Sequence, residues 1–440
     1  MKLKKHNKSN ELILAFILFL IIFNPPFIRG FSFTITTVVV SGLLCLIKYK
    51  FISKNILCSD FYKMIGILLL YFIYVSGVGA VNSVISSLGR LVIVNICREI
   101  ILYIAVMVVA VFIAYITLRG FYSFEGLLKA YVYCGVMQSI LSIFSYFIPK
   151  IRNFLNAVMV ANVRYENIAR LTYNSNGLRC YGFASTLFDT FGCAMSLMAI
   201  IALYLAIAGK RIFYLYFGMI SLSAFMNTRT SLVLITMGFF LVLFLNIKNQ
   251  LSLKKFIKLA ELGTGVFIIS VIALRYINSY STSLTSEWIK SGIESIRMLL
   301  FDRTIDRTWR GANTSYFGIL FDKFLFLPDD FLSVLFGTGL PPINAAGRGS
   351  DVAYVQHIWK YGIVGAGIQY LMYMYAIRQG DRGLDIKYKG LISCLGIMIF
   401  IFLIKSEGLS YGMPGLILLP LIFSVWSFKR KRKQQILSKP

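Results

Sequence analysis

Apolar residues follow one another in long, almost uninterrupted blocks along this chain. Three of these blocks read ILAFILFLIIF, ILYIAVMVVAVFIAYI and LVLITMGFFLVLFL. A helix satisfies its backbone hydrogen bonds internally, so blocks of this length are typical of membrane spans. The pattern predicts about twelve helices of this kind. They are expected over residues 11–28, 32–47, 61–80, 99–118, 127–149, 186–208, 212–226, 230–247, 258–275, 352–377, 390–405 and 413–428.

Composition supports the same class of protein. The 440 residues are 58% hydrophobic, with a mean hydropathy of +0.75. A soluble domain cannot bury so much apolar surface, whereas a bilayer can. The seven cysteines are odd in number, lie mostly in or beside apolar runs and lack metal-ligand spacing. We therefore expect an all-α, polytopic transmembrane bundle without a metal site.

Basic segments orient the predicted bundle. An even number of spans places both termini on one side of the membrane. The N-terminal KLKKHNK and the C-terminal KRKRKQQ then face the cytoplasm, together with KYKFISK, NIKNQLSLKKFIK and IKYK. The basic and then apolar N-terminus is typical of a signal-anchor, because further spans follow it and no small-residue cleavage site does. Both termini are therefore expected in the cytoplasm.

This orientation leaves two long loops outside, near residues 150–185 and 276–351. The second is too long for a connector and contains helix-like stretches such as SEWIKSGIESIRMLLFDRTIDRTW. The chain is thus expected to have three parts. Residues 1–275 hold nine spans and the basic loop, residues 276–351 form a large periplasmic loop, and residues 352–440 hold three spans and a basic tail. No internal repeat supports an inverted-repeat transporter.

The net charge of +27 divides unequally between lysine and arginine. The predicted cytoplasmic side carries 20 Lys and 6 Arg, and the outer side 5 Lys and 14 Arg. Membrane orientation depends on charge alone, whereas the arginine fork binds phosphate and carboxylate oxygens in bidentate fashion. An arginine-rich outer side therefore favours a phosphate- or carboxylate-bearing ligand. The alternative for any one arginine is an ion pair with an outer acid, but the outer arginines outnumber those acids. Nucleic-acid binding is not expected, because no basic stretch belongs to a folded domain outside the membrane.

The segment LFGTGLPPINAAGRGSDVAYVQHIWKYGIVG (335–365) is an irregular, glycine-rich approach to a predicted span. Arg348 and Asp351 lie where that helix begins, beside exposed backbone N–H groups and the positive end of its dipole. Asp351 is a candidate general base, although it or Ser350 is equally well explained as the helix N-cap. His357 lies inside the span, where a single histidine more often forms a hydrogen bond within a bundle than catalyses.

Three further segments place polar residues at the outer side. In FMNTRTSLVL (225–234), Arg229 lies between two tightly connected helices, where an arginine is either functional or reaches out to the interface. In NSNGLRCYGFASTLFDTFG (174–192), Arg179 precedes a span whose first turns hold Asp189, a possible arginine partner. LIKSEGLSYGMPG (403–415) contributes Lys405 and Glu407, which are equally consistent with a local salt bridge.

At these residues the chain resembles Wzy-type O-antigen polymerases, within the superfamily that includes O-antigen ligases. The resemblance covers the whole chain in topology. Its motifs are short: LRCYGF with Arg179, NTRTS with Arg229, and a GTG turn followed by Asp351 and a span with Gly362-Ile-Val-Gly365. In the ligase branch a histidine, followed by Asn, typically opens that span. Counting back from the glycines, the equivalent position here is Asp351, which favours polymerase over ligase.

The resemblance implies a glycosyltransferase of type C character. An undecaprenyl-diphosphate-linked repeat unit would be transferred from its lipid onto another such unit, and outer arginines would stabilise the leaving diphosphate. Arg179, Arg229 and Arg348 are the expected diphosphate ligands. Arg310 and His357 are further candidates for binding the diphosphate or glycan, and Asp351 is the expected base or its orienter. The diphosphate already supplies the activation, so no nucleotide or other cofactor is expected. A chain-length regulator is an implied partner, and a bacterial inner membrane is the implied location.

The main competing function, from another class of protein, is a lipid-linked oligosaccharide flippase or other transporter. Such a protein is expected to carry charge within its spans and to have short loops on both faces. Here the apolar stretches 101–116 and 230–247 carry no charge, and one outer loop is far longer than any inner one. These features favour chemistry at the membrane surface. An O-antigen ligase and a non-enzymatic assembly scaffold are less favoured functions that the sequence leaves open.

Overall fold

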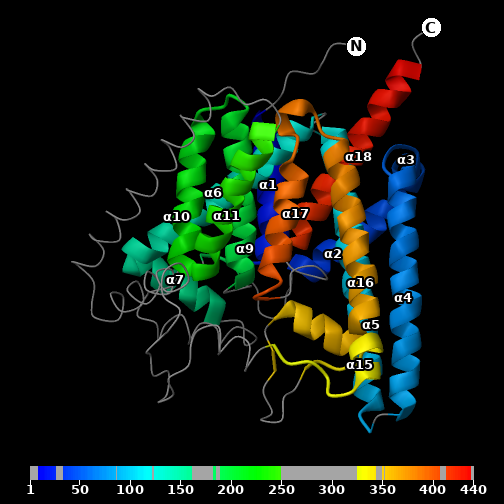
Figure 1. Cartoon of the computed structure of the whole chain (residues 1–440). Coiled ribbons are helices and arrows are strands. Elements are labelled where there is room, and N and C mark those ends of the chain that lie inside the picture. The colour runs from blue at the N-terminus through cyan, green and yellow to red at the C-terminus, as the bar shows by residue number, and fades with distance from the viewer. Residues whose placement is uncertain are drawn as a thin grey trace.

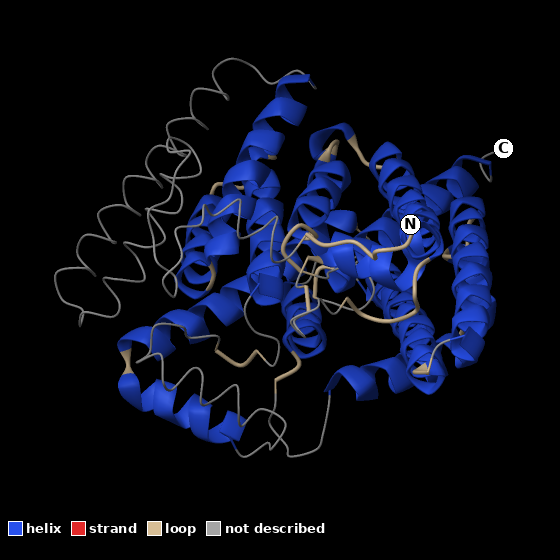
Figure 2. Cartoon of the chain, turned by 60° about the horizontal axis from the view of Figure 1, so that its bottom comes forward, coloured by secondary structure: helices blue, strands red, loops and turns tan. Residues whose placement is uncertain are grey.

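The computed structural model describes residues 8–25, 33–85, 87–120, 123–160, 182–184, 189–248, 325–342, 349–350, 352–406 and 413–437. Within these ranges the regular elements are all helices, with no strand (Figure 2). The expected all-α class is thus confirmed for this part of the chain. The predicted span 258–275 and most of the large loop 276–351 lie outside the described residues.

The helices follow the apolar blocks along the chain (Figure 1). They are α1 (Lys8–Phe23), α2 (Phe33–Ile47), α3 (Tyr49–Asn55), α4 (Ser59–Ile85), α5 (Gly89–Gly120), α6 (Phe124–Phe147), α7 (Pro149–Val160), α9 (Asp189–Ile207), α10 (Ile212–Asn227), α11 (Arg229–Lys248), α15 (Phe331–Phe336), α16 (Ala353–Arg382), α17 (Leu391–Phe402) and α18 (Gly415–Leu437). A 3₁₀ turn over Ile386–Tyr388 joins α16 to α17.

Several of these helices are long and apolar enough to cross a membrane. Among the described residues they are α4, α5, α6 and α9, and the α2–α3 pair, bent by 84°, would make a fifth. Three shorter apolar helices lie at Ser9–Phe23, Ile212–Asn227 and Thr230–Leu245. These helices indicate a multi-pass membrane protein. The count of twelve spans stays a prediction.

Burial separates a central helix from a peripheral one. The apolar window of α9 is 89% buried, because α6, α10, α11 and α17 pack around it. The corresponding window of α4 is only 28% buried, and large apolar side chains such as Ile73 are exposed on it. An apolar surface of this kind is stable against lipid and costly in water. Helix α4, at the edge of the bundle, thus has the exposed apolar surface of a lipid-facing span.

Contacts between distant segments define two ends of the bundle. At one end, α9, α11 and α16 begin and α10 and α17 end; we call this the Asp189 end. At the other, α1, α6 and α10 begin and α9 and α16 end; we call this the Glu125 end. As far as they are described, the predicted outer segments lie at the Asp189 end and the predicted cytoplasmic ones at the Glu125 end. The described helices thus alternate in direction as the sequence predicts.

Helix α16 is broken rather than straight. Gly362 has φ 65° and ψ 177°, so the backbone leaves the helical region at this residue. The first arm, Ala353–Tyr361, lies crosswise to the second, which runs along the bundle from the break to Arg382 (Figure 1). The predicted span 352–377 is therefore two arms. A glycine makes this break, because a side chain at such backbone angles is strained.

The remaining differences from the expected helices concern their ends and short elements. Helix α5 begins at Gly89, ten residues before the expected 99, and thus includes Arg90 and Arg98 in its first turns. Helices α3, α7 and α15, of 7, 12 and 6 residues, do not stand out as apolar blocks in the sequence. Short helices lack the long apolar run on which the sequence prediction depends.

Candidate functional site

A sharp helical hairpin positions Arg229. Helix α10 ends at Asn227, Thr228 is extended with φ −145° and ψ 141°, and α11 begins at Arg229. The Thr228 hydroxyl accepts a hydrogen bond from the backbone nitrogen of Ser231 at 3.2 Å, as an N-cap residue does. One extended residue thus separates two antiparallel helices. Arg229 is the first residue of α11; its side chain lies outside the described residues.

This hairpin packs closely against α9. A Cβ atom added at Gly192 would lie 2.0 Å from the Thr228 Oγ1 atom and 2.5 Å from the Ser231 Oγ atom. No side chain fits in that space, so the glycine allows α9 to contact the hairpin directly. Ser196, one turn further along α9, donates to the Gly192 carbonyl at 2.7 Å. The beginning of α9 is therefore fixed against the residues on both sides of Arg229.

Asp189 joins three helices at this end. The Thr230 hydroxyl of α11 donates to its Oδ1 atom at 2.5 Å, and the Lys405 Nζ atom, just beyond α17, lies 4.0 Å from its Oδ2 atom. The side chain of Asp189 is 27% exposed and that of Lys405 is 50% exposed. The sequence suggested an arginine as the partner of Asp189; among the described residues its partners are a threonine and a lysine.

The first arm of α16 also begins here. The backbone nitrogen of Ala353 donates to the Leu403 carbonyl at 3.0 Å, two residues before Lys405. The Ser350 hydroxyl accepts from the Val352 nitrogen at 3.2 Å, and its carbonyl accepts from the Gln356 side chain at 2.8 Å. Val352 is the N-cap residue of this helix and its side chain makes no capping bond. The Ser350 hydroxyl thus accepts a hydrogen bond from Val352, which precedes the first residue of the helix, and not from a backbone nitrogen inside the helix.

Three helices therefore begin at this end of the bundle. The N-termini of α9 and α11 lie together beside the Lys405 ammonium, and that of α16 lies against Leu403, two residues before Lys405. The first backbone N–H groups of a helix point outward, and its dipole places a partial positive charge at that end. One carboxylate, Asp189, lies among them with part of its surface accessible. Positive helix ends and a lysine around an accessible surface favour an anionic ligand such as a phosphate group.

The GTG turn of the sequence motif supports the break in α16. The backbone nitrogens of Thr338 and Gly339 donate to the carbonyls of Trp359 and Lys360 at 2.7 and 3.0 Å. The Tyr74 hydroxyl of α4 donates to the Tyr361 carbonyl at 3.1 Å. These carbonyls have no helical partner beyond Gly362, so the turn and α4 replace the lost hydrogen bonds. The motif thus has a structural task in holding the crosswise arm.

His357 lies on that arm and is buried, with 1% of its surface exposed. Its Nδ1 atom is 2.7 Å from the Tyr370 hydroxyl oxygen, on the second arm. The ring of Tyr370 also packs edge-on against Tyr354 of the first arm. The sequence left two explanations for His357, a catalytic or binding role and a hydrogen bond within the bundle. The structure shows such a hydrogen bond. It joins the two arms across the break.

A buried polar layer lies beneath the hairpin, and sequence reasoning did not find it. The Asn227 amide donates to the Ser142 hydroxyl of α6 and to the Ser223 carbonyl, both at 2.8 Å. Gln138 and Ser139 of α6 are also fully buried. The signal was present in the serines and glutamine of the 127–149 span, which interrupt an apolar helix at its inward face. Such polar groups are stable in a bundle core when they bond to one another.

Four of the predicted site residues, Arg179, Arg310, Arg348 and Asp351, lie outside the described residues. The structure does place neighbours of three of them. Gly182, three residues after Arg179, contacts α6, where an added Cβ would be 2.9 Å from the Gln138 side chain. Gly349 and Ser350 precede Asp351 and lead into the arm of α16. The segments that the sequence singled out separately are thus brought to one end of the bundle.

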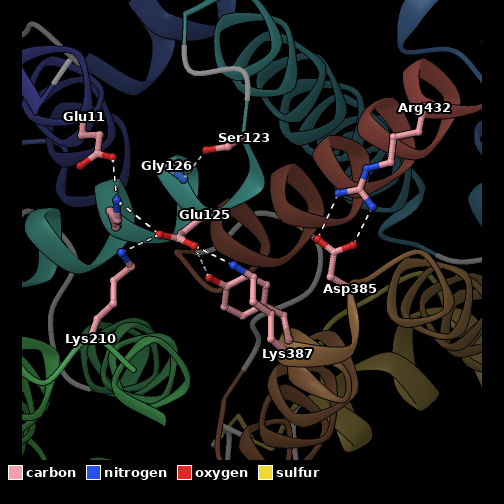
Figure 3. A network of polar contacts seen from close by, with 10 residues as sticks. Glu11, Ser123, Glu125, Gly126, Lys210, Asp385, Lys387 and Arg432 are labelled. Carbon is pink, nitrogen blue, oxygen red and sulfur yellow. Dashed lines mark hydrogen bonds and ion pairs between the residues drawn. The ribbon is translucent and has the colours of Figure 1, made fainter. Parts of the chain in front are cut away.

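The Glu125 end has a different polar network (Figure 3). The Glu125 carboxylate accepts hydrogen bonds from Lys387 and the Tyr388 hydroxyl, both at 2.8 Å, and lies 3.0 Å from Lys210 and 3.5 Å from Lys129. Lys129 also pairs with Glu11 of α1 at 3.1 Å. Burial, and secondarily the hydrogen bond to Glu125, raises the pKa of Tyr388. One acid therefore ties α6 to the two loops that join α9 to α10 and α16 to α17.

A second pair closes this end near the C-terminus. Arg432 of α18 binds the Asp385 carboxylate with both guanidinium nitrogens, at 2.6 and 3.0 Å (Figure 3). The hydrogen bond from Arg432 lowers the pKa of Asp385. Paired lysines and arginines at this end agree with its predicted cytoplasmic position.

No protein-family model matches this chain, and no curated protein gives a match.

Proposed function

We propose that this protein polymerises lipid-linked repeat units of a surface polysaccharide, by glycosyl transfer at the Asp189 end of its bundle. The donor is an undecaprenyl-diphosphate-linked oligosaccharide. The observation that carries the proposal is the convergence of the N-termini of α9, α11 and α16 beside Lys405. Positive helix ends at the membrane surface suit a leaving group that is a lipid diphosphate.

The chemistry needs three functions at one place. A hydroxyl oxygen of the acceptor sugar attacks the anomeric carbon of the donor, the bond from that carbon to the diphosphate oxygen breaks, and a base takes the hydroxyl proton. Arg179, Arg229 and Arg348 belong to the converging segments and are the proposed diphosphate ligands. Arg310, of the large loop, is proposed to bind diphosphate or glycan. The diphosphate supplies the activation, so the reaction needs no nucleotide.

Asp351 and His357 have proposed roles beside these ligands. Asp351 would activate or orient the acceptor hydroxyl from the beginning of the crosswise arm. His357 is bonded to Tyr370 within the bundle, so its contribution to the glycan site is to fix that arm. The position of the arm in turn decides where the segment holding Arg348 and Asp351 meets α9 and α11.

The proposed setting is the inner membrane of a bacterium. The lysines at the Glu125 end face the cytoplasm, and the Asp189 end faces the periplasm, where a flipped lipid-linked repeat unit would present its diphosphate. A polysaccharide chain-length regulator is the proposed protein partner, and the bilayer lipid is in contact with the outward faces of α4 and α5.

A flippase is the second candidate, and one observation favours it. The buried layer of Gln138, Ser139, Ser142 and Asn227 is the kind of polar surface that lines a path through a transporter. Against it, the apolar window of α9 is 89% enclosed by neighbouring helices, so the centre of the bundle is filled. The polymerase is therefore the preferred function.

Deletion of the gene in its host tests the proposal. Polysaccharide from the deletion strain is separated by size on a gel. Loss of long chains with retention of a single repeat unit supports a polymerase. Complete loss of substituted lipid A core points to a flippase or a ligase.

Variants of the candidate site follow in the same assay. Arg179→Ala and Arg229→Ala are expected to lose the ladder, and Arg432→Ala at the Glu125 end is the matched control that should keep it. Normal ladders from Arg229→Ala at normal expression would contradict the site assignment.

A further inference from the structure

We infer that Asp189 is the base that takes the proton from the attacking sugar hydroxyl, an inference that rests on the proposed function. The sequence offered Asp351 for this role or as its orienter. The geometry points to Asp189 as the base, and the orienting role of Asp351 stays a prediction from the sequence. Asp189 belongs to α9, whereas the proposed diphosphate ligands belong to other segments. The base and the phosphate ligands are then held on separate elements that meet at one end of the bundle.

The two oxygens of this carboxylate have different surroundings. Oδ1 accepts the hydrogen bond from Thr230 at 2.5 Å, which fixes the orientation of the carboxylate. Oδ2 lies 4.0 Å from the Lys405 Nζ atom, beyond hydrogen-bonding distance. With 27% of its side chain exposed, Asp189 can be reached from outside the bundle. A carboxylate that is fixed through one oxygen, with part of its side chain accessible, has the geometry that a general base needs.

Two other described carboxylates, Glu99 and Asp330, are less suitable. Glu99 of α5 is 7% exposed, so a sugar hydroxyl cannot approach it. Asp330 accepts from the Ser333 nitrogen at 2.7 Å and serves as the N-cap of α15. Neither lies where the N-termini of α9, α11 and α16 converge. Asp189 combines accessibility with that position.

Asp189 also has a plain structural explanation, because an acid in the first turn of a helix interacts favourably with the helix dipole. Its contacts go further than that effect requires. The carboxylate binds a side chain of α11 and lies beside one that follows α17, at the end of the bundle where α11 begins. The two explanations predict different kinetics, which makes them separable.

The step balances as follows. The proton of the acceptor hydroxyl passes to Oδ2 of Asp189 as the hydroxyl oxygen forms a bond to the anomeric carbon of the donor. The bond between that carbon and the diphosphate oxygen breaks, and its electron pair leaves with the diphosphate. Lys405 and the three helix N-termini lie where they can offset the charge on the departing group. The protonated Asp189 then releases its proton to water through its exposed side.

The test uses purified full-length protein in lipid, with its undecaprenyl-diphosphate-linked repeat unit as substrate. Asp189→Asn is expected to lower kcat by on the order of 100- to 10,000-fold and to leave the KM for the donor within about threefold. Asp385→Asn, at the opposite end, is the matched control and should keep wild-type kinetics. Asp189→Asn with kcat within threefold of wild type overturns the inference.

Chemical rescue keeps the inference testable if the amide variant folds poorly. Asp189→Ala with added sodium formate is expected to regain activity in proportion to formate, because a small carboxylate can occupy the vacated space and accept the proton. Absence of rescue in a folded Asp189→Ala variant, or an equal loss of donor binding and kcat, would assign Asp189 a structural role instead. Wild-type protein that makes no polymer contradicts the proposed function itself, and that result is distinguishable from either outcome for Asp189.

Discussion

Gly337 lies directly against Gly362, where an added Cβ on Gly337 would be 2.6 Å from the Gly362 nitrogen. A Cβ added to Gly362 would in turn lie 2.1 Å from the Leu335 carbonyl oxygen. The two backbones touch because neither residue has a side chain. This contact allows the GTG turn to supply hydrogen bonds to the carbonyls at the end of the crosswise arm. The glycines of the sequence motif thus help to hold the arm.

We expect Gly362→Ala to destabilise the protein. Alanine at φ 65° is strained by about 1–3 kcal/mol, and the clash with Leu335 adds to this cost. Gly367 lies in the same helix with nothing within 4 Å of an added Cβ, so Gly367→Ala is the matched control. It should leave stability unchanged or raise it by up to about 1 kcal/mol through helix propensity. Thermal unfolding in detergent measures both, and equal midpoints would refute the account of the break.

Gly192 gives a second prediction of the same form. Gly192→Ala should force the hairpin around Arg229 away from α9, because the new methyl group would meet the Thr228 and Ser231 hydroxyls. We expect loss of polymer formation together with lower stability. Gly218→Ala, in α10 with open space around it, is the control and should keep both. Full activity of Gly192→Ala would show that the close contact does not position the site.

The lysines around Glu125 predict a stability effect at the other end. Glu125→Gln removes the negative charge that Lys129, Lys210 and Lys387 share. The three ammonium groups then remain close together without that carboxylate. We expect a loss of about 1–3 kcal/mol in the free energy of unfolding. Denaturant titration at neutral pH in a fixed detergent measures it. An unchanged midpoint would mean that the network contributes nothing.

Asp385→Asn is the matched control for this change. Asp385 and Arg432 are 44% and 61% exposed, and such pairs contribute about 0–1 kcal/mol. Because its folded-state pKa is lowered, Asp385 contributes stability above its ordinary pKa and loses it as the pH falls through the lowered value. The pair is therefore intact at neutral pH, where the comparison with Glu125→Gln is made.

Opposite ends of the bundle should lie on opposite sides of the membrane. In a cysteine-free background, Lys210→Cys lies at the Glu125 end and Asn153→Cys lies on α7, which follows the end of α6. A membrane-impermeant maleimide added to cells with a permeabilised outer membrane should label position 153. It should label position 210 only after the inner membrane is also opened. The reverse pattern, or labelling of both positions from one side, would contradict the orientation.

The positions of the described helices were largely predictable from the apolar blocks. The contacts that bring the candidate site residues together were not. The block of α9 marks a span, but nothing in it says that Asp189 meets Thr230 and Lys405, which are 41 and 216 residues away. Such contacts depend on which helices are neighbours, and hydropathy does not encode that. The composition also concealed the break in α16, because Gly362 lies inside a stretch that otherwise has helical composition.

For the candidate residues too, the sequence predicted which positions stand out, and only the fold shows what they contact. The sequence marked Arg229 by its charge between two apolar helices, and the structure adds the one-residue hairpin that explains its position. His357 stood out as a histidine in a span, and only the fold shows its bond to Tyr370. The polar layer around Asn227 escaped notice, because serines and amides are common in sequence and become informative only when they face one another.

The central claim is that the Asp189 end joins lipid-linked glycan units, and polymerisation by the purified protein tests it most directly. The protein in lipid is incubated with its undecaprenyl-diphosphate-linked repeat unit, and the products are separated by size. We predict a ladder of chains that grow by one repeat unit, which Arg229→Ala abolishes and Asp385→Asn retains. Recovery of the single repeat unit alone from folded wild-type protein would contradict the account.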